Sequence, residues 1–367
     1  MTLSVLHVVV AGEVGGAERF VADLAAPGRA DGVEHVVALL ASSPSLAAFF
    51  RGSGARVVDL GPVTESIGAF LVRTFGARYV TRVADVARDT CARIAHLHTF
   101  GSHVIGARAA ERAGIPFVRT EHSTRVYSDP SCWPFSRWSL RRSRAVVAVS
   151  DYVRRVALAR EPTLGRKISV VRNGILFDRF AARPMRGGKG EPVAFVIVAR
   201  LERRKGVDLA LTALAGLRGA RLSIVGDGDD RQRLEAHARK LGLDGRVTFH
   251  GYQPDPRPFM AAADVGLCTS RDEGLGIGLL EMMACALPVV AVPVGGVPEI
   301  VRTGETGLLS SERSGPALRA VMQAIVDDGD LRRRLGEQAR AYVARHHTLE
   351  TVRESYGRVY RDALASR

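Results

Sequence analysis

Short apolar runs alternate with helical patterns along almost the whole chain, and this alternation limits the fold more than any other feature. A first series has strand-like runs at residues 3–10, 35–40, 56–59, 94–98, 117–121 and 145–150, separated by helical patterns such as 17–26, 72–92 and 103–113. Strands that alternate with helices form parallel sheets with helices on both faces. The sequence therefore predicts an α/β fold.

The alternation stops near Asn173-Gly174, and residues 177–191 have the composition of a linker. A second series follows, with strands predicted at 192–200, 220–225, 247–250, 265–269 and 287–292 and with helices at 315–327, 331–346 and 349–364 that end the chain without another strand. A chain of 367 residues accommodates two domains of about 180 residues each. We predict two Rossmann-like, doubly wound domains, 1–178 and 190–348, facing across a cleft that holds the ligand at the carboxyl ends of the strands.

Two glutamates enclose a glycine-rich turn in the second series, where a strand should lead into a helix. The run is Glu273-Gly274-Leu275-Gly276-Ile277-Gly278-Leu279-Leu280-Glu281. Glycines let the backbone approach a ligand closely, and a helix that begins near Ile277 presents free N–H groups to an anion. A solvated surface loop would explain either glutamate alone, but the apolar helix and buried-type strand that follow do not fit that interpretation. The motif suits a phosphorylated sugar, with the carboxylates accepting hydrogen bonds from hydroxyl groups.

A pair of cations follows the strand predicted at 192–200. Arg200 and Lys205 lie five residues apart at the ligand end of that strand. Arginine offers a planar fork to phosphate oxygens, and lysine offers a compact charge on a flexible stem. Basic residues at the start of a helix often only face solvent. The glutamate motif in the same domain supports a phosphate-binding role for this pair. The nearby Gly226-Asp227-Gly228 lacks the third glycine of a dinucleotide fingerprint, which argues against a nicotinamide or flavin enzyme.

The first domain contributes a second set of candidates. Gly15 and Gly16 follow the first predicted strand, where flexible backbone could approach an anion or could simply form a tight turn. Three histidines, His96, His98 and His122, end or follow predicted strands, and each could point into the cleft or have a purely structural role. Of the three, His122 is the best functional candidate, because it directly follows the strand at 117–121. Neutral imidazole can donate to a sugar hydroxyl or relay a proton.

The net charge of +14 points to an anionic partner, which could be nucleic acid, an acidic membrane surface or a phosphorylated substrate. Residues 125–144 contain both tryptophans of the chain among several arginines, which suits either shallow docking on an anionic membrane or ordinary helix packing. The four cysteines lack metal-ligand spacing, and neither a signal peptide nor a membrane-spanning run is evident. We expect a cytoplasmic location, with contact at the inner face of the membrane as an option.

Several of these motifs together resemble the retaining glycosyltransferases of family 4, which have the two-domain GT-B fold. The resemblance spans nearly the whole chain and rests on Gly15-Gly16, His122, Asn173-Gly174, Arg200 with Lys205, the run from Glu273 to Glu281, and Gly295-Gly296 with Glu299. The two glutamates and the apolar residues after them are the most specific part. Ala286 departs from the pattern, because the family often has glycine at that position.

The resemblance implies a role for each candidate residue. Arg200 and Lys205 would hold the diphosphate of a nucleotide-sugar donor, and Glu281 would bind the nucleotide ribose. Backbone N–H groups of Ile277, Gly278, Leu279 and Leu280, with Gly15-Gly16 from the first domain, would complete the phosphate cradle. Glu273 would contact the donor sugar and His122 would lie near the reacting carbon. The first domain would be the acceptor side, and the final helix, 349–367, would return to it.

The resemblance also implies hexosyl transfer with retention, and without a metal or other cofactor. The acceptor hydroxyl, on a glycan, a lipid-linked sugar or a small molecule, would attack on the face that the diphosphate leaves, in cell-surface polysaccharide or glycolipid synthesis. A GT-B phosphorylase or a sugar-nucleotide epimerase would use the same cradle. A basic nucleic-acid-binding protein is the remaining alternative, but the chain lacks an aromatic RNA-binding signature, so no nucleic acid is expected.

Overall fold

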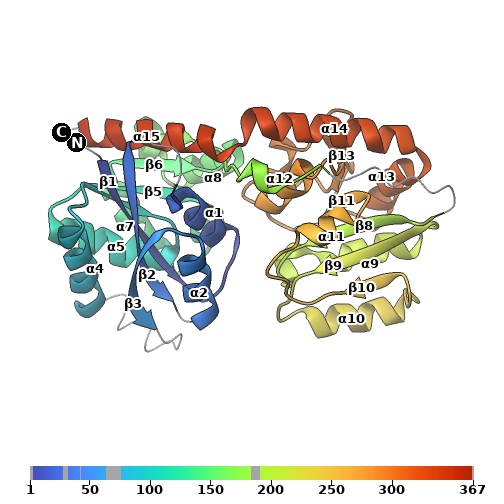
Figure 1. Ribbon diagram of the computed structural model, residues 1–367, viewed down its shortest axis with the longest axis horizontal. Coiled ribbons are helices and arrows are strands. Elements are labelled where there is room, and N and C mark those ends of the chain that lie inside the picture. The colour runs from blue at the N-terminus through green and yellow to red at the C-terminus, as the bar shows by residue number, and fades with distance from the viewer. Residues whose placement is uncertain (1–2, 28–31, 42, 63–75, 183–190, 366–367) are drawn as a thin grey trace. The chain divides into compact units, whose positions relative to one another are not determined.

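The computed structural model describes residues 3–27, 32–41, 43–62, 76–182 and 191–365 (Figure 1). The chain forms two compact units, one of Met1–Asn173 with Leu349–Arg367 and the other of Gly174–Thr348. The boundary between them lies at Asn173 and Gly174, slightly before the position 178 that the sequence pattern favoured. The C-terminal helix belongs to the first unit. Much of the predicted linker, and the first part of the helix expected at 72–92, lie outside the described residues.

The first unit is built on a parallel sheet with strand order β3-β2-β1-β4-β5-β6-β7. Its strands are β1 (Leu3–Ala11), β2 (Val33–Ala41), β3 (Arg56–Pro62), β4 (Ile94–Leu97), β5 (Phe117–Glu121), β6 (Ala145–Ala148) and β7 (Ile168–Val170). Its helices are α1 (Gly16–Ala25), α2 (Pro44–Gly52), α4 (Arg78–Asp89), α5 (Phe100–Ala113), α6 (Arg125–Ser128), α7 (Trp133–Arg142), α8 (Asp151–Arg160) and α15 (Leu349–Ala365), with a 3-10 turn at Pro162–Arg166.

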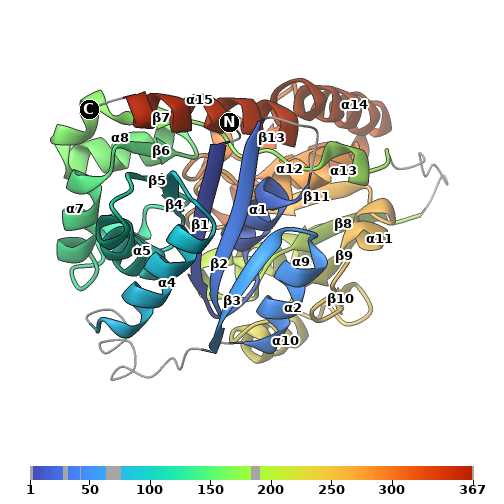
Figure 2. The ribbon, with the colours of Figure 1, turned by 60° about the vertical axis from the view of Figure 1, so that its left-hand side comes forward.

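Side chains alternate between the two faces of this sheet, as strand geometry requires. Leu6 and Val8 of β1 point to one face, where they join a buried apolar cluster with residues of α4 and α5. His7 points to the other face, which α1 and α15 cover (Figure 2). Tyr356 and Tyr360 of α15 lie there fully buried. The second face carries most of the histidines described below.

The second unit has a parallel sheet with strand order β10-β9-β8-β11-β12-β13. Its strands are β8 (Val193–Val198), β9 (Ala220–Val225), β10 (Val247–Phe249), β11 (Val265–Cys268), β12 (Val289–Ala291) and β13 (Gly307–Leu309). Its helices are α9 (Val207–Ala215), α10 (Arg231–Lys240), α11 (Arg257–Ala261), α12 (Ile277–Ala284), α13 (Gly315–Asp327) and α14 (Gly329–His346), with 3-10 turns at Phe177–Arg179, Arg203–Lys205 and Val297–Glu299. Phe195, Leu211, Leu222 and Met322 lie in its buried core.

Both sheets confirm the predicted doubly wound α/β class, but each has an edge strand that the sequence did not indicate. These are β7 and β13, each three residues long. The expectation that no strand follows residue 292 was wrong, because β13 pairs with β12 along its whole length. A run of three residues is too short to show the alternation by which a strand is recognised. Across the described ranges, no helix combines the length and apolar character needed to cross a bilayer.

Candidate active site

Three loops of the second unit meet at the carboxyl ends of β8, β11 and β12. Gly206 has φ +62°, and a Cβ there would lie 2.2 Å from the carbonyl oxygen of Thr269. Gly295 has φ +57°, and a Cβ there would lie 2.0 Å from the carbonyl oxygen of Glu273. The N–H of Gly296 donates to that same oxygen at 2.9 Å. Glycine is therefore required at both places for the three loops to pack this closely.

Lys205 and Glu273 form an ion pair at this meeting point. Lys205 Nζ donates to Glu273 Oε2 at 2.7 Å, and Ser270 Oγ donates to the same oxygen at 3.1 Å. The side chains of Lys205 and Glu273 are 20% and 17% exposed, so both can reach a ligand from solvent. The two residues were predicted as separate candidates from distant parts of the sequence, and the fold brings them into direct contact.

The helix that begins at Ile277 is α12, capped by Gly276 at φ +99°. The N–H groups of Leu279 and Leu280 both approach the Gly276 carbonyl oxygen, at 3.1 and 3.3 Å. Those of Ile277 and Gly278 make no hydrogen bond within the described ranges. A Cβ on Gly278 would touch only the carbonyl oxygen of Val198, at 3.5 Å. The first turn of α12 thus has two N–H groups available to an anion, with open space beside them.

Glu281 and Arg200 complete the predicted set in the second unit. Glu281 lies on α12 and is only 5% exposed. Burial raises the pKa of the neighbouring Cys285 thiol to about 11, and the negative charge of Glu281 contributes to that rise. Arg200 is exposed in the loop after β8, which keeps its guanidinium accessible to solvent. The loops at these strand ends therefore carry two cations, two carboxylates and a helix N-terminus.

The first unit holds the other candidates. Gly15 is the N-cap of α1 and Gly16 its first residue, and the N–H of Gly15 donates to Glu18 Oε2 at 3.0 Å. Phe20, one turn further along α1, has its ring centroid 5.6 Å from that of His122. His122 directly follows β5, as predicted, and burial lowers its pKa to about 4. Its ring is therefore neutral at physiological pH.

The other two histidine candidates do not line an open site. His96 and His98 are 0% and 2% exposed. The His96 ring packs against Tyr356 and Tyr360 of α15. His96 Nδ1 lies 2.7 Å from the Tyr360 hydroxyl, and His96 Nε2 lies 2.7 Å from Thr120 Oγ1. Of the two roles that the sequence left open for these histidines, their burial supports the structural one. The helix that covers His96 is more than two hundred residues away in sequence, so local pattern could not place it.

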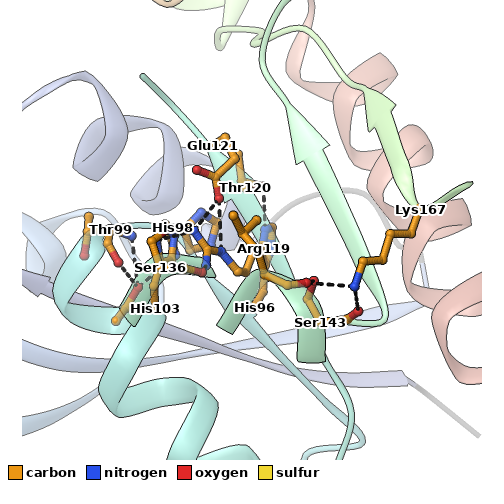
Figure 3. A network of polar contacts seen from close by, with 12 residues as sticks. His96, His98, Thr99, His103, Arg119, Thr120, Glu121, Ser136, Ser143 and Lys167 are labelled. Carbon is orange, nitrogen blue, oxygen red and sulfur yellow. Dashed lines mark hydrogen bonds and ion pairs between the residues drawn. The ribbon is translucent and has the colours of Figure 1, made fainter. Parts of the chain in front are cut away.

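The buried polar residues continue on the opposite side of β5 (Figure 3). Arg119 and Glu121 form an ion pair at 2.7 Å, and their side chains are 0% and 1% exposed. Arg119 also donates to the Ser136 carbonyl oxygen at 2.8 Å and lies 2.8 Å from His103 Nδ1. This network was not predicted from the sequence, although charged residues inside an otherwise apolar strand were a visible signal.

His7, His96 and His98 could in principle hold a metal ion. One ring nitrogen from each lies within 4.8 Å of the others, and all three residues are buried. Burial keeps the pKa of each of the three imidazoles well below the ordinary value, and neutral imidazole is the form that binds metals. The same nitrogens, however, already make hydrogen bonds to other side chains.

The aromatic and basic segment at 125–144 is largely occupied with contacts inside the fold. The guanidinium of Arg142 lies over the Trp138 ring at 4.9 Å, and that of Arg160 lies over Trp133 at 5.0 Å. Arg137 and Arg141 both pair with the buried carboxylate of Glu161, at 2.6 and 3.3 Å. These contacts lower the pKa of Glu161 to about 2, and they account for much of the positive charge of α7 without a membrane.

Comparisons with known proteins agree across both units. Residues 14–179 match the family described as Glycosyltransferase Family 4, and residues 178–342 match the family described as Glycosyl transferases group 1. The D-inositol 3-phosphate glycosyltransferase of Acidothermus cellulolyticus is 31% identical over 309 residues, covering 75% of this chain and 68% of the relative. The lipopolysaccharide core biosynthesis glycosyltransferase LpsE of Rhizobium meliloti is 36% identical over 159 residues, which are 43% of this chain and about half, 47%, of the relative.

A solved structure also has the same fold. HepE from Anabaena, in complex with UDP and glucose, superimposes with a TM-score of 0.82 at 22% identity, over 98% of this chain and 99% of HepE. The likeness covers both units.

Proposed function

The chain belongs to the family 4 type of glycosyltransferases with the GT-B fold, which use nucleotide sugars, and we propose that it transfers a sugar to an acceptor hydroxyl with retention of configuration. The observation that carries this proposal is the ion pair between Lys205 and Glu273 beside the available N-terminus of α12. A cation, a carboxylate and a helix N-terminus at one strand end suit a ligand that is part diphosphate and part sugar.

The donor diphosphate binds at the first turn of α12. Its oxygens accept hydrogen bonds from the N–H groups of Ile277 and Gly278, and the helix dipole favours the negative charge. Lys205 and Arg200 neutralise the remaining charge. As the glycosidic bond breaks, negative charge grows on the leaving phosphate, and these fixed donors stabilise it without reorganisation.

The two glutamates bind the two ends of the donor. The Glu281 carboxylate is almost fully buried, so a nucleotide ribose that donates its hydroxyl hydrogens would compensate for the lost hydration. Phosphate binding to Lys205 releases Glu273 from its ion pair. The freed Glu273 carboxylate then accepts hydrogen bonds from hydroxyl groups of the donor sugar.

The transfer step needs neither a metal nor a covalent intermediate with the protein. The acceptor oxygen forms a bond to the anomeric carbon on the face from which the diphosphate leaves, and the acceptor proton passes to the departing phosphate oxygen. The acceptor is a glycan, a lipid-linked sugar or a small molecule used in cell-surface glycan synthesis. Determining the anomeric configuration of the product by NMR tests the stereochemistry; an inverted product would contradict same-face attack.

Thermal-shift screening against UDP-, GDP-, ADP- and CMP-sugars tests the donor site, because a ligand that binds only the folded state raises the melting temperature. We expect one nucleotide class to raise it, and Lys205→Ala and Glu281→Ala to abolish the rise. Lys240→Ala is the matched control, since Lys240 is an exposed lysine at the end of α10. An unchanged shift in both site variants would show that the donor binds elsewhere. Release of nucleoside diphosphate only when an acceptor is added distinguishes a transferase from a phosphorylase or an epimerase.

A further inference from the structure

Four histidines form a continuous hydrogen-bonded row across neighbouring strands of the first unit. His7 Nε2 lies 2.8 Å from His35 Nδ1, and His7 Nδ1 lies 2.9 Å from His98 Nε2. His98 Nδ1 in turn lies 3.3 Å from His122 Nε2. The row, called here the histidine row, consists of His35 on β2, His7 on β1, and His98 and His122 at the ends of β4 and β5. It therefore reaches from β2 to His122, whose ring packs against that of Phe20 on α1.

Each link in the row joins the Nδ1 atom of one ring to the Nε2 atom of another. A neutral imidazole carries one proton, so one ring nitrogen donates and the other accepts. If one ring carries its proton on Nε2, its neighbours must do the same, or two donors or two acceptors would meet. The row has only two consistent arrangements, all Nε2–H or all Nδ1–H. The tautomer of His122 is thus coupled to that of every other member.

The surroundings keep the two central rings of the row, His7 and His98, neutral. His7 and His98 are 0% and 2% exposed, and burial holds the pKa of both well below 6.5. Charging His7 or His98 would also break a link, because both nitrogens of each ring take part in links and an imidazolium has no acceptor nitrogen. The rings of His7 and His98 stack with centroids 5.2 Å apart, which limits their rotation. His7 and His98 therefore form a fixed, neutral centre of the row.

Neutral alkyl imidazole is more stable in water with its proton on Nε2, so the all-Nε2–H arrangement places all four rings in their favoured form. That arrangement leaves Nδ1 of His122 unprotonated. This nitrogen is buried and has no hydrogen-bond partner among the described residues. A buried acceptor without a partner suits a ligand group that donates a hydrogen bond.

We propose that His35, His7 and His98 are positioning residues that hold His122 as the Nε2–H tautomer and so present its Nδ1 as an acceptor to a substrate hydroxyl. This inference rests on the proposed function, and on the resemblance to family 4 enzymes, which implies that His122 lies near the reacting carbon. The hydroxyl belongs either to the donor sugar or to the acceptor. In the opposite tautomer, His122 would present an N–H and could not accept this hydrogen bond.

Nitrogen NMR of the full-length protein, with 15N in the histidine rings, measures the tautomers without any substrate. We expect His122 to be a single Nε2–H tautomer at neutral pH, and His98→Ala to turn it into a mixture of both forms. His237→Ala, which removes a histidine on α10 of the second unit, is the control and leaves the His122 signals unchanged. A wild-type mixture, an Nδ1–H form, or no change in His98→Ala would overturn the proposal.

A pair of substitutions at His7 separates positioning from folding. His7→Asn keeps an acceptor oxygen near the former Nδ1, so it keeps the hydrogen bond from His98 and the single tautomer of His122. His7→Leu removes that acceptor and produces the mixture, although both variants lose the ring. If the two variants behave alike, the row does not transmit the tautomer. Stoichiometric zinc in the purified protein would also contradict the proposal, because metal on His7 and His98 would replace their hydrogen bond.

Activity supplies the second readout. For His98→Ala we expect kcat to fall by roughly tenfold, the loss typical of removing an outer hydrogen-bond partner, with the donor KM nearly unchanged. If the hydroxyl belongs to the nucleotide-sugar donor, the donor alone should shift the His122 Nδ1 signal. If the hydroxyl belongs to the acceptor, the signal should shift only when the acceptor is added. If neither ligand moves the signal while the tautomers behave as expected, the row positions His122 but the placement of substrate in the proposed function is wrong.

Discussion

Lys205 Nζ lies 2.7 Å from Glu273 Oε2. The cation proposed to bind phosphate and the carboxylate proposed to bind sugar are therefore paired with each other before any ligand binds. The pair joins the loop after β8 to the loop after β11, and Ser270 holds the same carboxylate oxygen. A donor must therefore exchange this ion pair for two new interactions. The exchange couples phosphate binding to the release of Glu273.

This coupling predicts opposite profiles for two variants. Lys205→Ala should weaken binding of the nucleoside diphosphate at least tenfold, because a charge-assisted hydrogen bond is lost. Glu273→Gln should bind the same diphosphate as tightly as the wild type or more tightly, since Lys205 is no longer held, but should turn over about a hundredfold more slowly. Calorimetric titration with the diphosphate and steady-state kinetics measure the two effects. Weaker diphosphate binding by Glu273→Gln would contradict the exchange.

Gly278→Ala tests the N-terminus of α12 without disturbing the fold. The added methyl group would touch only the Val198 carbonyl oxygen at 3.5 Å, an ordinary contact, and alanine favours the helix by about 1 kcal/mol. We expect normal or increased thermal stability, but a loss of donor binding of tenfold or more, because the methyl group occupies the space beside the free N–H groups. Gly357→Ala in α15 is the matched control, with stability changed and binding unchanged. Retained binding in Gly278→Ala would place the phosphate elsewhere.

Local pattern was sufficient to place the second-unit candidates along the fold. Arg200, Lys205 and Glu273 lie in the segments that follow β8 and β11, and Glu281 lies on α12, the helix that follows β11. Parallel strands bring their carboxyl ends to one edge of the sheet. The contact between Lys205 and Glu273 could not be predicted from the sequence. It depends on the order of β8 and β11 within the sheet, and on glycines at 206 and 295 whose close approaches appear only in three dimensions.

The buried histidines were not predictable for a different reason. His7 lies in the middle of an apolar strand, and nothing near it in sequence says which residues cover that face of the sheet. Its environment is set by β2, β4 and α15, and α15 lies at the far end of the chain. The strands themselves were predicted well, because their apolar runs are local. Contacts between residues that are distant in sequence could not be predicted in this way.

Ala286 gives a prediction about stability. It follows α12 with φ +59°, in the left-handed region that disfavours a Cβ, and its carbonyl oxygen would lie 2.2 Å from a Cβ on Gly336 of α14. The backbone is therefore held in place by packing, which explains why glycine suits this position. Ala286→Gly should stabilise the protein by up to about 1 kcal/mol, after the greater freedom of unfolded glycine is subtracted.

Urea denaturation followed by far-UV circular dichroism measures this gain. Ala236→Gly on the exposed side of α10 is the control, and it should cost about 1 kcal/mol because its backbone is helical. Equal destabilisation by both substitutions would mean that position 286 is not strained.

The free energy of unfolding should decrease strongly when one partner of the ion pair between Arg119 and Glu121 is removed, and much less when both are replaced. Both side chains are buried, so Glu121→Leu leaves an uncompensated guanidinium and should cost about 3–5 kcal/mol. Replacing both residues in Arg119→Met/Glu121→Leu should recover much of that loss. A double-mutant cycle of unfolding free energies measures the coupling, and strictly additive losses would contradict it.

Four histidines, His7, His96, His98 and His122, should make the first unit sensitive to acid. Burial lowers the pKa of His122 to about 4 and holds those of His7, His96 and His98 well below 6.5. In the unfolded chain these groups titrate near 6.5, so the unfolded state binds more protons as the pH falls below that value. The stability that these neutral histidines contribute is fully present above pH 6.5, and it is lost as the pH falls toward their folded-state pKa values. The slope is about 1.4 kcal/mol per pH unit for each histidine that stays neutral only when folded.

Tryptophan fluorescence can follow this loss in the first unit alone, because Trp133 and Trp138 are the two tryptophans of the chain and both lie on α7. The urea concentration at the unfolding midpoint should decrease as the pH is lowered from 6.5 to 4.5. It should stay constant between pH 7 and pH 8. His96→Gln removes one titrating group, and its amide can still reach Thr120 Oγ1, so this variant should have a shallower dependence on pH than the wild type. A midpoint that is the same at pH 4.5 and pH 7 would mean that these histidines are already charged in the folded protein, or that they are not buried there.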